Sequence, residues 1–181
     1  MFVLITGGSG SGKSEYAEGL ALKLEPGKKL YLATMMVWDE EGRKRVSRHK
    51  KMREGKRFET VEIYSDLEKF TIPDGFKGKR PTILLECMSN LVCNEFYRQE
   101  KEAYCRIVRG IERLLSCSEH LIVVTNEVCS DGAAYSDETE RYRKLLGQIN
   151  CYLAGRAGLV AEAVCGIPVF WKQDRAAAEK R

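Results

Sequence analysis

The chain has 181 residues, of which 44% are hydrophobic, a length and composition that suit one compact domain with a single core. Its net charge of +4 is small for a protein that coats nucleic acid, so we expect no nucleic-acid partner. No apolar run approaches the length of a membrane span, and residues 1–5 are too short for a signal-peptide core, which together predict a cytoplasmic protein. The seven cysteines include no C-x-x-C pair and are expected to be reduced and mostly buried.

Short apolar runs alternate with helix-like stretches, which predicts an α/β fold with a mostly parallel sheet. Runs such as 83–85 and 121–124 are continuously apolar, as expected of strands covered on both faces. The predicted strands are Phe2–Thr6, Lys29–Thr34, Glu59–Tyr64, Thr82–Glu86, Leu121–Thr125, Leu159–Val164 and Pro168–Trp171. The predicted helices are Lys13–Leu24, Glu40–Arg53, Ser65–Phe70, Arg98–Cys117 and Asp137–Arg156. One domain over residues 1–173, with a surface loop at 75–81, is followed by a tail, 174–181, that is expected to fray.

A glycine-rich segment follows the first predicted strand. It reads Gly7-Gly8-Ser9-Gly10-Ser11-Gly12-Lys13-Ser14 and matches G-x-x-x-x-G-K-[ST] between a strand and a helix, the context that this motif requires. The glycines let backbone N–H groups close around phosphate oxygens, and the helix that begins near Lys13 points the positive end of its dipole at the same anion. Lys13 adds a full charge, and the Ser14 hydroxyl can ligate Mg²⁺. A chance match has odds below ~1% over this length, so we predict a nucleotide phosphate site rather than a flexible turn.

Acidic and amide side chains follow two of the later apolar runs. Glu86 ends the run 83–85, where a carboxylate in this class of fold holds Mg²⁺, directly or through water. It could instead act as a general base toward an acceptor hydroxyl, or be a solvated acid at the end of a strand. Asn126 and Glu127 follow the run 121–124, and the carboxyl ends of parallel strands are where such sheets bind ligands.

The segment 43–57 contains nine Lys or Arg residues against one acid, Glu54, with His49 in its middle. A solvated basic helix is one interpretation, and a nucleic-acid or membrane patch is another that lacks interleaved aromatics and an apolar face. A triphosphate site fits better, because the segment follows the second strand and could face the phosphate loop. Like charge around His49 disfavours its protonated form, which suits nucleophilic attack on phosphorus.

These blocks together resemble the bifunctional adenosylcobinamide kinase/adenosylcobinamide-phosphate guanylyltransferase family, from the first strand to about Trp171. The resemblance rests on several separated blocks in the right order. They are Ile5 to Ser14, Tyr31-Leu32-Ala33-Thr34, Arg48-His49-Lys50, Leu84-Leu85-Glu86-Cys87, Val124-Thr125-Asn126-Glu127-Val128 and the late helix around Tyr142 to Asn150.

The resemblance implies a P-loop NTPase-type (RecA-like) three-layer fold and two reactions. The first phosphorylates the aminopropanol side chain of adenosylcobinamide with ATP or GTP, and the second transfers GMP from GTP through a guanylylated histidine, with His49 as the matching residue. It also implies a homotrimer, Mg²⁺ near Ser14 and Glu86, and catalytic residues His49, Lys13 and Glu86. The implied nucleotide contacts are Gly7, Gly8, Ser9, Gly10, Ser11, Gly12, Lys13, Ser14, Ala33, Thr34, Met35, Lys50, Lys51, Met52, Arg53, Glu62 and Glu86.

Two departures from the family pattern and two alternative functions bear on these expectations. Gly10 stands where the family loop often carries Arg, and residues 129–135 lack the usual Val-Pro pair, which affects the expected corrinoid-facing loop. A simple small-molecule kinase explains the phosphate loop and Glu86 but not the placement of His49. A regulatory GTPase is suggested by Asp39-Glu40-Glu41-Gly42, a match to D-x-x-G, but the chain has no N-K-x-D motif.

Overall fold

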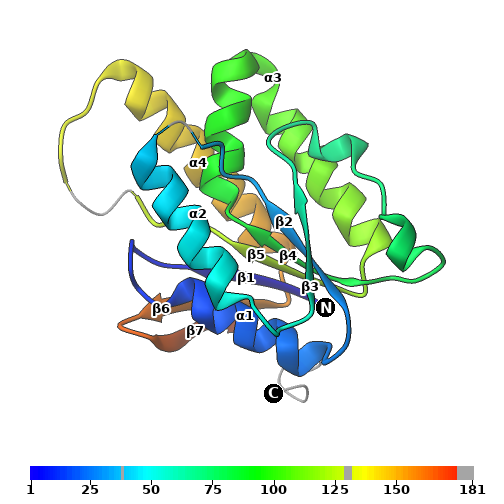
Figure 1. Ribbon diagram of the computed structural model, residues 1–181. Helices are drawn as coiled ribbons and strands as arrows, with labels where there is room; N and C mark the ends of the chain where they lie inside the picture. The colour runs from blue at the N-terminus through cyan, green and yellow to red at the C-terminus, as the bar shows by residue number, and fades with distance from the viewer. Residues whose placement is uncertain (38, 129–131, 175–181) are drawn as a thin grey trace.

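The computed structural model describes residues 1–37, 39–128 and 132–174. They form a seven-stranded sheet in the order β3-β2-β4-β5-β1-β6-β7, parallel except for the last pair (Figure 1). The strands are β1 (Phe2–Thr6), β2 (Lys29–Ala33), β3 (Phe58–Glu62), β4 (Thr82–Glu86), β5 (His120–Val124), β6 (Leu159–Val164) and β7 (Ile167–Gln173). The α-helices are α1 (Lys13–Leu24), α2 (Glu40–Met52), α3 (Met88–Cys117) and α4 (Asp137–Arg156), with short 3₁₀ helices η1 (Leu67–Lys69) and η2 (Asp74–Phe76).

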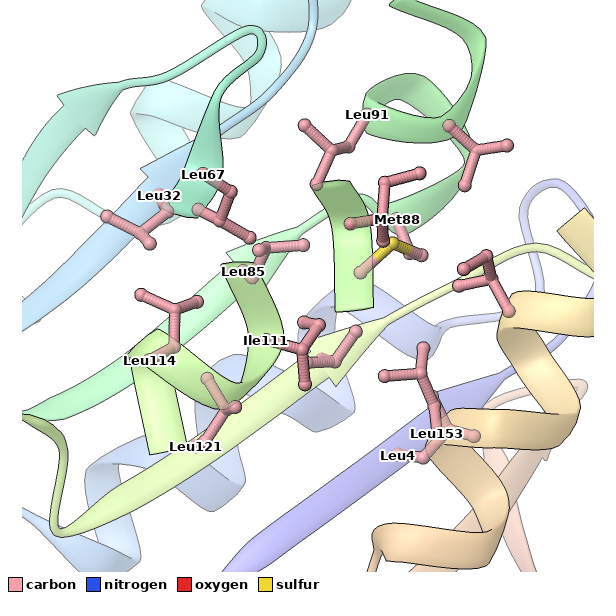
Figure 2. Packing of buried hydrophobic residues seen from close by; sticks show 14 of the residues in the cluster. Leu4, Leu32, Leu67, Leu85, Met88, Leu91, Ile111, Leu114, Leu121 and Leu153 are labelled. Carbon is pink, nitrogen blue, oxygen red and sulfur yellow. The ribbon is translucent and has the colours of Figure 1, made fainter. Parts of the chain in front are cut away.

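Alternate residues of the central strands enter two separate cores, which makes the fold a three-layer one. In β1, Val3 and Ile5 pack with α1 on one face, whereas Leu4 packs with α3 and α4 on the other. Figure 2 shows the larger core, in which Leu85 and Leu121 from the sheet meet Ile111 and Leu114 of α3. This two-sided burial explains the continuous apolar runs of the strands, because both faces of a parallel sheet are covered by helices. The α/β prediction with a mostly parallel sheet is confirmed.

Two predicted elements differ from the structure by more than two residues at an end, whereas the other predicted bounds agree to within two residues. The helix predicted at Ser65–Phe70 is wrong, since only the three-residue 3₁₀ helix η1 forms there. The helix predicted from Arg98 begins ten residues earlier, at Met88, and has a non-helical residue, Gln99 (φ −166°, ψ 90°), inside it. Residues 88–96 of α3 are buried or half-buried, so they lack the alternation of apolar and polar residues that marks a helix with one exposed face.

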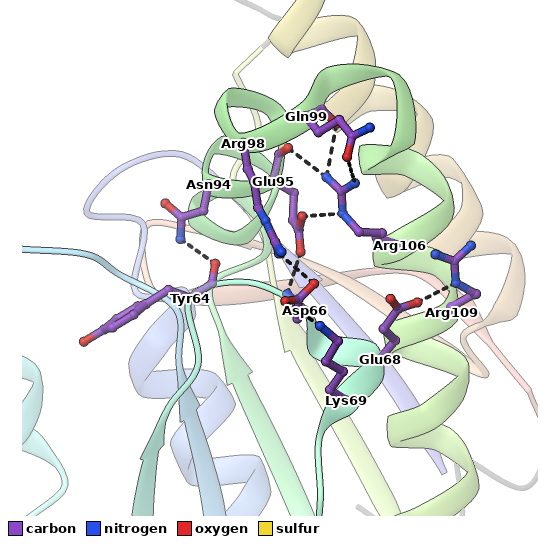
Figure 3. A network of polar contacts seen from close by, with 10 residues as sticks. All are labelled: Tyr64, Asp66, Glu68, Lys69, Asn94, Glu95, Arg98, Gln99, Arg106 and Arg109. Carbon is purple, nitrogen blue, oxygen red and sulfur yellow. Dashed lines mark hydrogen bonds and ion pairs between the residues drawn. The ribbon is translucent and has the colours of Figure 1, made fainter.

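A buried ion pair supports the kink in α3 (Figure 3). The Arg106 Nε donates to Glu95 Oε2 at 2.7 Å, and its Nη2 donates to the backbone carbonyls of Glu95 and Gln99 at 3.2 and 3.1 Å. Arg106 therefore satisfies carbonyl groups next to the interruption of the helix. The other Glu95 oxygen accepts from the backbone N–H of Asp66 at 2.7 Å, which attaches the segment after β3 to α3.

Candidate active site

The phosphate loop connects β1 to α1, as its sequence predicts. Gly12 caps α1 with a φ of +88°, and a Cβ there would lie 2.9 Å from the Cα of Gly166. Gly7 has a φ of +150°, and its Cβ would lie 2.6 Å from the Ser11 hydroxyl and 2.8 Å from the carbonyl oxygen of Ala163. Both positions therefore require glycine for space as well as for backbone conformation. The Lys13 Nζ donates to the carbonyl oxygen of Gly8 at 2.9 Å, so the lysine lies back along its own loop.

The carboxyl ends of three neighbouring strands form the floor beside this loop. Ala33 at the end of β2 is in register with Glu62 of β3 on one side and with Glu86 of β4 on the other. All three line a cavity of about 390 Å³ that is also lined by the phosphate loop and by α2. The register thus places two acidic side chains on either side of a small residue, at the edge where parallel sheets bind ligands.

The carboxylate of Glu86 contacts several other polar side chains in the cavity. Its Oε1 accepts a hydrogen bond from the Ser14 hydroxyl, and its Oε2 accepts one from the Tyr31 hydroxyl at 3.2 Å. Burial raises the pKa of the Tyr31 hydroxyl, and the adjacent Glu86 carboxylate raises it further, so Tyr31 stays a neutral donor. Because Ser14 and Glu86 supply hard oxygen atoms at one point of the phosphate loop, this pair fits the ligand preference of Mg²⁺.

Helix α2 and the residue that follows its end supply a further part of the cavity lining. His49 lies on it with its side chain 21% exposed, and its Nδ1 is 3.8 Å from Glu86 Oε1. The guanidinium of Arg53, which follows α2, stacks over the Tyr31 ring at 3.5 Å from the centroid. Arg53 is 8% exposed, and its buried Nη1 has no hydrogen-bond partner. The cationic segment therefore brings a histidine and a buried guanidinium to the same cavity as the phosphate loop.

Most of the site residues expected from the sequence meet at this cavity. Those lining it are Ser9, Gly10, Ser11, Gly12, Lys13, Ser14, Ala33, Met35, His49, Lys50, Met52, Arg53, Glu62 and Glu86. Four of the implied nucleotide contacts are not among the lining residues, and neither is Glu127. Gly7 is buried at the base of the loop, Gly8 is exposed, Thr34 donates its buried hydroxyl to the carbonyl of Cys87 at 2.7 Å, and Lys51 is exposed to solvent.

Several further lining residues were not identified from the sequence. Tyr31 lines the cavity and carries the one polar side-chain group among residues 30–33. A single polar group in an otherwise apolar strand could have identified Tyr31 as a site residue. Tyr64 also lines the cavity, and its hydroxyl donates a hydrogen bond to Glu62 at 2.7 Å. This hydrogen bond raises the pKa of Tyr64. Asn126, predicted only as an edge residue, lines the cavity and donates to the Ser89 hydroxyl at 2.8 Å.

The D-x-x-G match has a structural explanation. Asp39 is the N-cap of α2, and its carboxylate accepts the backbone N–H of Gly42 at 2.6 Å. An aspartate just before a helix commonly makes such a capping contact.

The loop 129–135, which differs from the family pattern, is described only in part, because residues 129–131 lie outside the described part of the chain. The tail beyond residue 174 also lies outside it. No helix within the described residues is both long enough and apolar enough to cross a membrane.

Two solved structures align with this chain at low sequence identity. One is an ATPase domain that is 10% identical with a TM-score of 0.46, covering 89% of this chain and 68% of that one. The other is a KaiC-like protein from Pyrococcus horikoshii OT3 that is 15% identical with a TM-score of 0.47, covering 89% and 69%.

Two curated relatives are described as bifunctional adenosylcobalamin biosynthesis protein CobU, one from Escherichia coli (strain K12) and one from Salmonella typhimurium (strain LT2). Each is 30% identical over 183 residues, covering 93% of this chain and 98% of the relative. Residues 3–170 match the family model of cobinamide kinase / cobinamide phosphate guanyltransferase. The chain therefore belongs to the cobinamide kinase / cobinamide phosphate guanyltransferase family.

Proposed function

We propose that this one cavity carries both activities of the family, with adenosylcobinamide and ATP or GTP as substrates. In the kinase step, the phosphate loop holds the nucleoside triphosphate and Lys13 offsets charge on the transferring phosphoryl group. In the guanylyl step, His49 attacks the α-phosphorus of GTP and carries GMP until cobinamide phosphate displaces it. The observation that supports a shared cavity is the 3.8 Å between His49 Nδ1 and Glu86 Oε1, since Glu86 also accepts the hydroxyl of Ser14 in the phosphate loop.

The cations at the end of α2 supply the charge that the second step needs. Lys50 and Arg53 line the cavity next to His49, and Arg53 is held by the Tyr31 ring. A fixed cation near a departing pyrophosphate stabilises the negative charge that develops on it. The free Nη1 of Arg53 is a buried donor whose hydrogen-bonding capacity a phosphate oxygen would satisfy.

We propose Ser14 and Glu86 as the protein groups near Mg²⁺ in both steps. When bound there with nucleotide, Mg²⁺ supplies charge neutralisation of the phosphate oxygens. Ser14 and Glu86 are already hydrogen-bonded to each other, so their oxygen atoms converge on one point. We expect both activities to be abolished by excess EDTA and restored by added Mg²⁺. Full turnover in EDTA would contradict the assignment.

The covalent intermediate is the sharpest test of this function. Incubation with GTP labelled on the α-phosphate should leave GMP on His49, identified by mass spectrometry of the digested protein. The phosphoramidate should be labile in mild acid and stable in base. His49→Ala should lose the label and guanylyl transfer and keep cobinamide kinase activity. The matched control is His120→Gln, a change of the other histidine, which lies at the start of β5 outside the cavity lining.

The same experiment separates the alternative functions. A simple kinase would phosphorylate cobinamide without retaining GMP, and a regulatory GTPase would do neither. Labelling that persists in His49→Ala, or a label that resists mild acid, would return the chain to the simple-kinase interpretation.

We also propose that the protein forms a homotrimer and is located in the cytoplasm. Support for a subunit contact comes from β7, which exposes Ile167, Val169 and Trp171 on one face. Exposed apolar groups of this kind are frequent at subunit interfaces. Support for a reducing compartment comes from the six cysteines within the described residues, all of which are free. Sedimentation equilibrium of the purified protein would give the subunit count.

A further inference from the structure

Two buried polar atoms without a hydrogen-bond partner belong to neighbouring side chains, one of which, His49, lines the cavity. The Nδ1 of His49 is buried and makes no hydrogen bond, and the same is true of Oε1 of Glu18. Glu18 lies on α1 and is fully buried. One ligand-capable atom each from Glu18, His49 and Glu86 lie within 4.8 Å of one another. Buried polar atoms without a hydrogen bond are rare in proteins, so two of them on neighbouring side chains call for a common explanation.

Glu18 is held so that only one of its oxygens is available. Its Oε2 accepts a hydrogen bond from Lys56 Nζ at 2.7 Å. The backbone carbonyl of Lys56 in turn accepts a hydrogen bond from the Nζ of the buried Lys29 at 2.9 Å. Lys56 lies just after α2, so this ion pair ties the end of the His49 helix to the phosphate-loop helix. Glu18 is four residues after Ser14, and positions four apart share one face of a helix. Glu18 therefore lies on the same face of α1 as Ser14, and Oε1 is its oxygen that has no hydrogen bond.

We propose that Glu18 is the positioning residue of the His49 nucleophile and that its free oxygen accepts the His49 Nδ1–H. This inference rests on the proposed guanylyl-transfer function and names a further residue that acts in it. One ring nitrogen of His49 and one carboxylate oxygen of Glu18 lie within 4.8 Å of each other, so a side-chain movement on the order of 2 Å brings the two groups to hydrogen-bond distance. The bond fixes the tautomer in which Nδ1 carries the proton and Nε2 carries the lone pair. Glu86 is the less suitable partner, because Ser14 and Tyr31 already donate to its two oxygens.

The proposed bond supports both halves of the transfer. Nε2 forms a bond to the α-phosphorus while the bond from that phosphorus to the bridging oxygen of pyrophosphate breaks, and pyrophosphate leaves with the electron pair. Nδ1 keeps its proton, so the ring becomes cationic, and the Glu18 carboxylate stabilises that charge. In the second half, a phosphate oxygen of cobinamide phosphate attacks the same phosphorus. The N–P bond breaks, its electron pair returns to Nε2, and the neutral ring is restored.

The test combines variants with nitrogen NMR of the histidine ring. Glu18→Gln should lower the rate of GMP–enzyme formation by about 100-fold or more, the scale on which loss of a histidine-orienting carboxylate acts. Kinase turnover of the same variant measures whether the fold and the phosphate loop survive. Glu18→Asp should restore part of the GMP-transfer rate. Glu40→Gln is the charge-matched control, since Glu40 lies at the start of α2 with its side chain 74% exposed.

The spectrum of the whole ¹⁵N-histidine-labelled protein, assigned with His49→Ala, decides the proposal even if Glu18→Gln does not fold. We expect His49 to carry its proton on Nδ1, and Glu18→Gln to shift that tautomer balance. A proton on Nε2 in the wild type, or a shift caused by Glu86→Gln and not by Glu18→Gln, would overturn the inference. So would tight binding of Zn²⁺ alone that is lost in both Glu18→Gln and His49→Ala, because the cluster would then be a metal site.

The proposed function and this inference fail in different ways. A wild-type protein that takes up no GMP refutes the guanylyl-transfer function, whatever the spectrum shows. A wild-type protein that takes up GMP on His49 at a rate unchanged by Glu18→Gln refutes only the positioning by Glu18.

Discussion

Helix α3 offers a direct comparison of a buried and an exposed arginine–glutamate pair. Arg106 and its partner Glu95 have side chains 9% and 1% exposed, whereas Arg109 and its partner Glu68 are 56% and 26% exposed. We expect Arg106→Met to destabilise the protein by about 3–5 kcal/mol, because a carboxylate is left buried without its counter-charge. Arg109→Met, one turn further along the same helix, should cost much less stability, because water screens the exposed pair.

The size of the expected destabilisation follows from the buried groups that lose a hydrogen-bond donor in Arg106→Met. Glu95 would retain only the backbone N–H of Asp66, and the carbonyls of Glu95 and Gln99 would each lose a donor at the kink. For a chain of this length, a loss of about 3–5 kcal/mol corresponds to a fall in Tm of roughly 6–20 °C. It is also a large fraction of a typical unfolding free energy of about 5–15 kcal/mol.

Urea unfolding followed by circular dichroism would measure both variants, with calorimetry giving Tm. A double variant, Glu95→Leu with Arg106→Leu, should recover a large part of the loss, because it removes both buried charges together. If Arg106→Met costs no more than Arg109→Met, then water reaches Glu95 and the buried-pair reasoning is refuted. A double variant as unstable as Arg106→Met alone would assign the cost to the kink carbonyls instead.

Two further predictions concern the phosphate loop and acid stability. Lys13→Ala should lower kinase turnover at saturating nucleotide by roughly 100-fold, since loss of one such electrostatic group costs about 3 kcal/mol of transition-state stabilisation; near wild-type turnover would refute the phosphate site. The Asp66 carboxylate bonds Arg98 at 2.6 Å and Lys69 at 3.1 Å, and the Arg98 contact lowers its pKa. Because the folded-state pKa is lowered, the stabilisation is present above the unfolded value of about 3.9 and is lost as pH falls through the folded value. Urea midpoints of Asp66→Asn and wild type should therefore differ at pH 6 and converge toward pH 2, and a constant difference would contradict this.

The elements that the sequence predicts best are those whose ends carry a local signal. Helix α1 begins at Lys13 because Gly12 adopts a positive φ that ends the phosphate loop, and strand β4 ends at Glu86 as the apolar run ends. The ends of α4 also agree with the prediction, since Ser136 caps the helix through the backbone N–H of Thr139. Such boundaries depend on contacts within a few residues, which a sequence displays directly.

The misses depend on contacts between distant segments. The first half of α3 is helical because Leu91 and Phe96 enter the core between sheet and helices, a placement that no local pattern displays. The segment around Leu67 forms a single 3₁₀ turn because Leu67 packs onto α3 at Gly110, where a Cβ would lie 2.6 Å from the leucine Cβ. Glu18 was not identified for the same reason, since its neighbours Lys56 and His49 lie far along the chain.

The position of His49 is determined by how α2 is attached at its two ends. At its start, Asp39 caps the helix, and just after its end Arg53 stacks on Tyr31 of β2. Three residues later, Lys56 pairs with Glu18 on the phosphate-loop helix. The helix that carries the proposed nucleophile is thus joined to the phosphate-loop helix by a partly buried ion pair. If guanylyl transfer needs His49 near the α-phosphorus while the phosphate loop holds the same nucleotide, this link keeps the two groups at a fixed separation. Breaking it with Lys56→Met should therefore impair GMP transfer more than phosphoryl transfer to cobinamide, because only the former uses a group on α2, and an equal loss of both activities would refute that division.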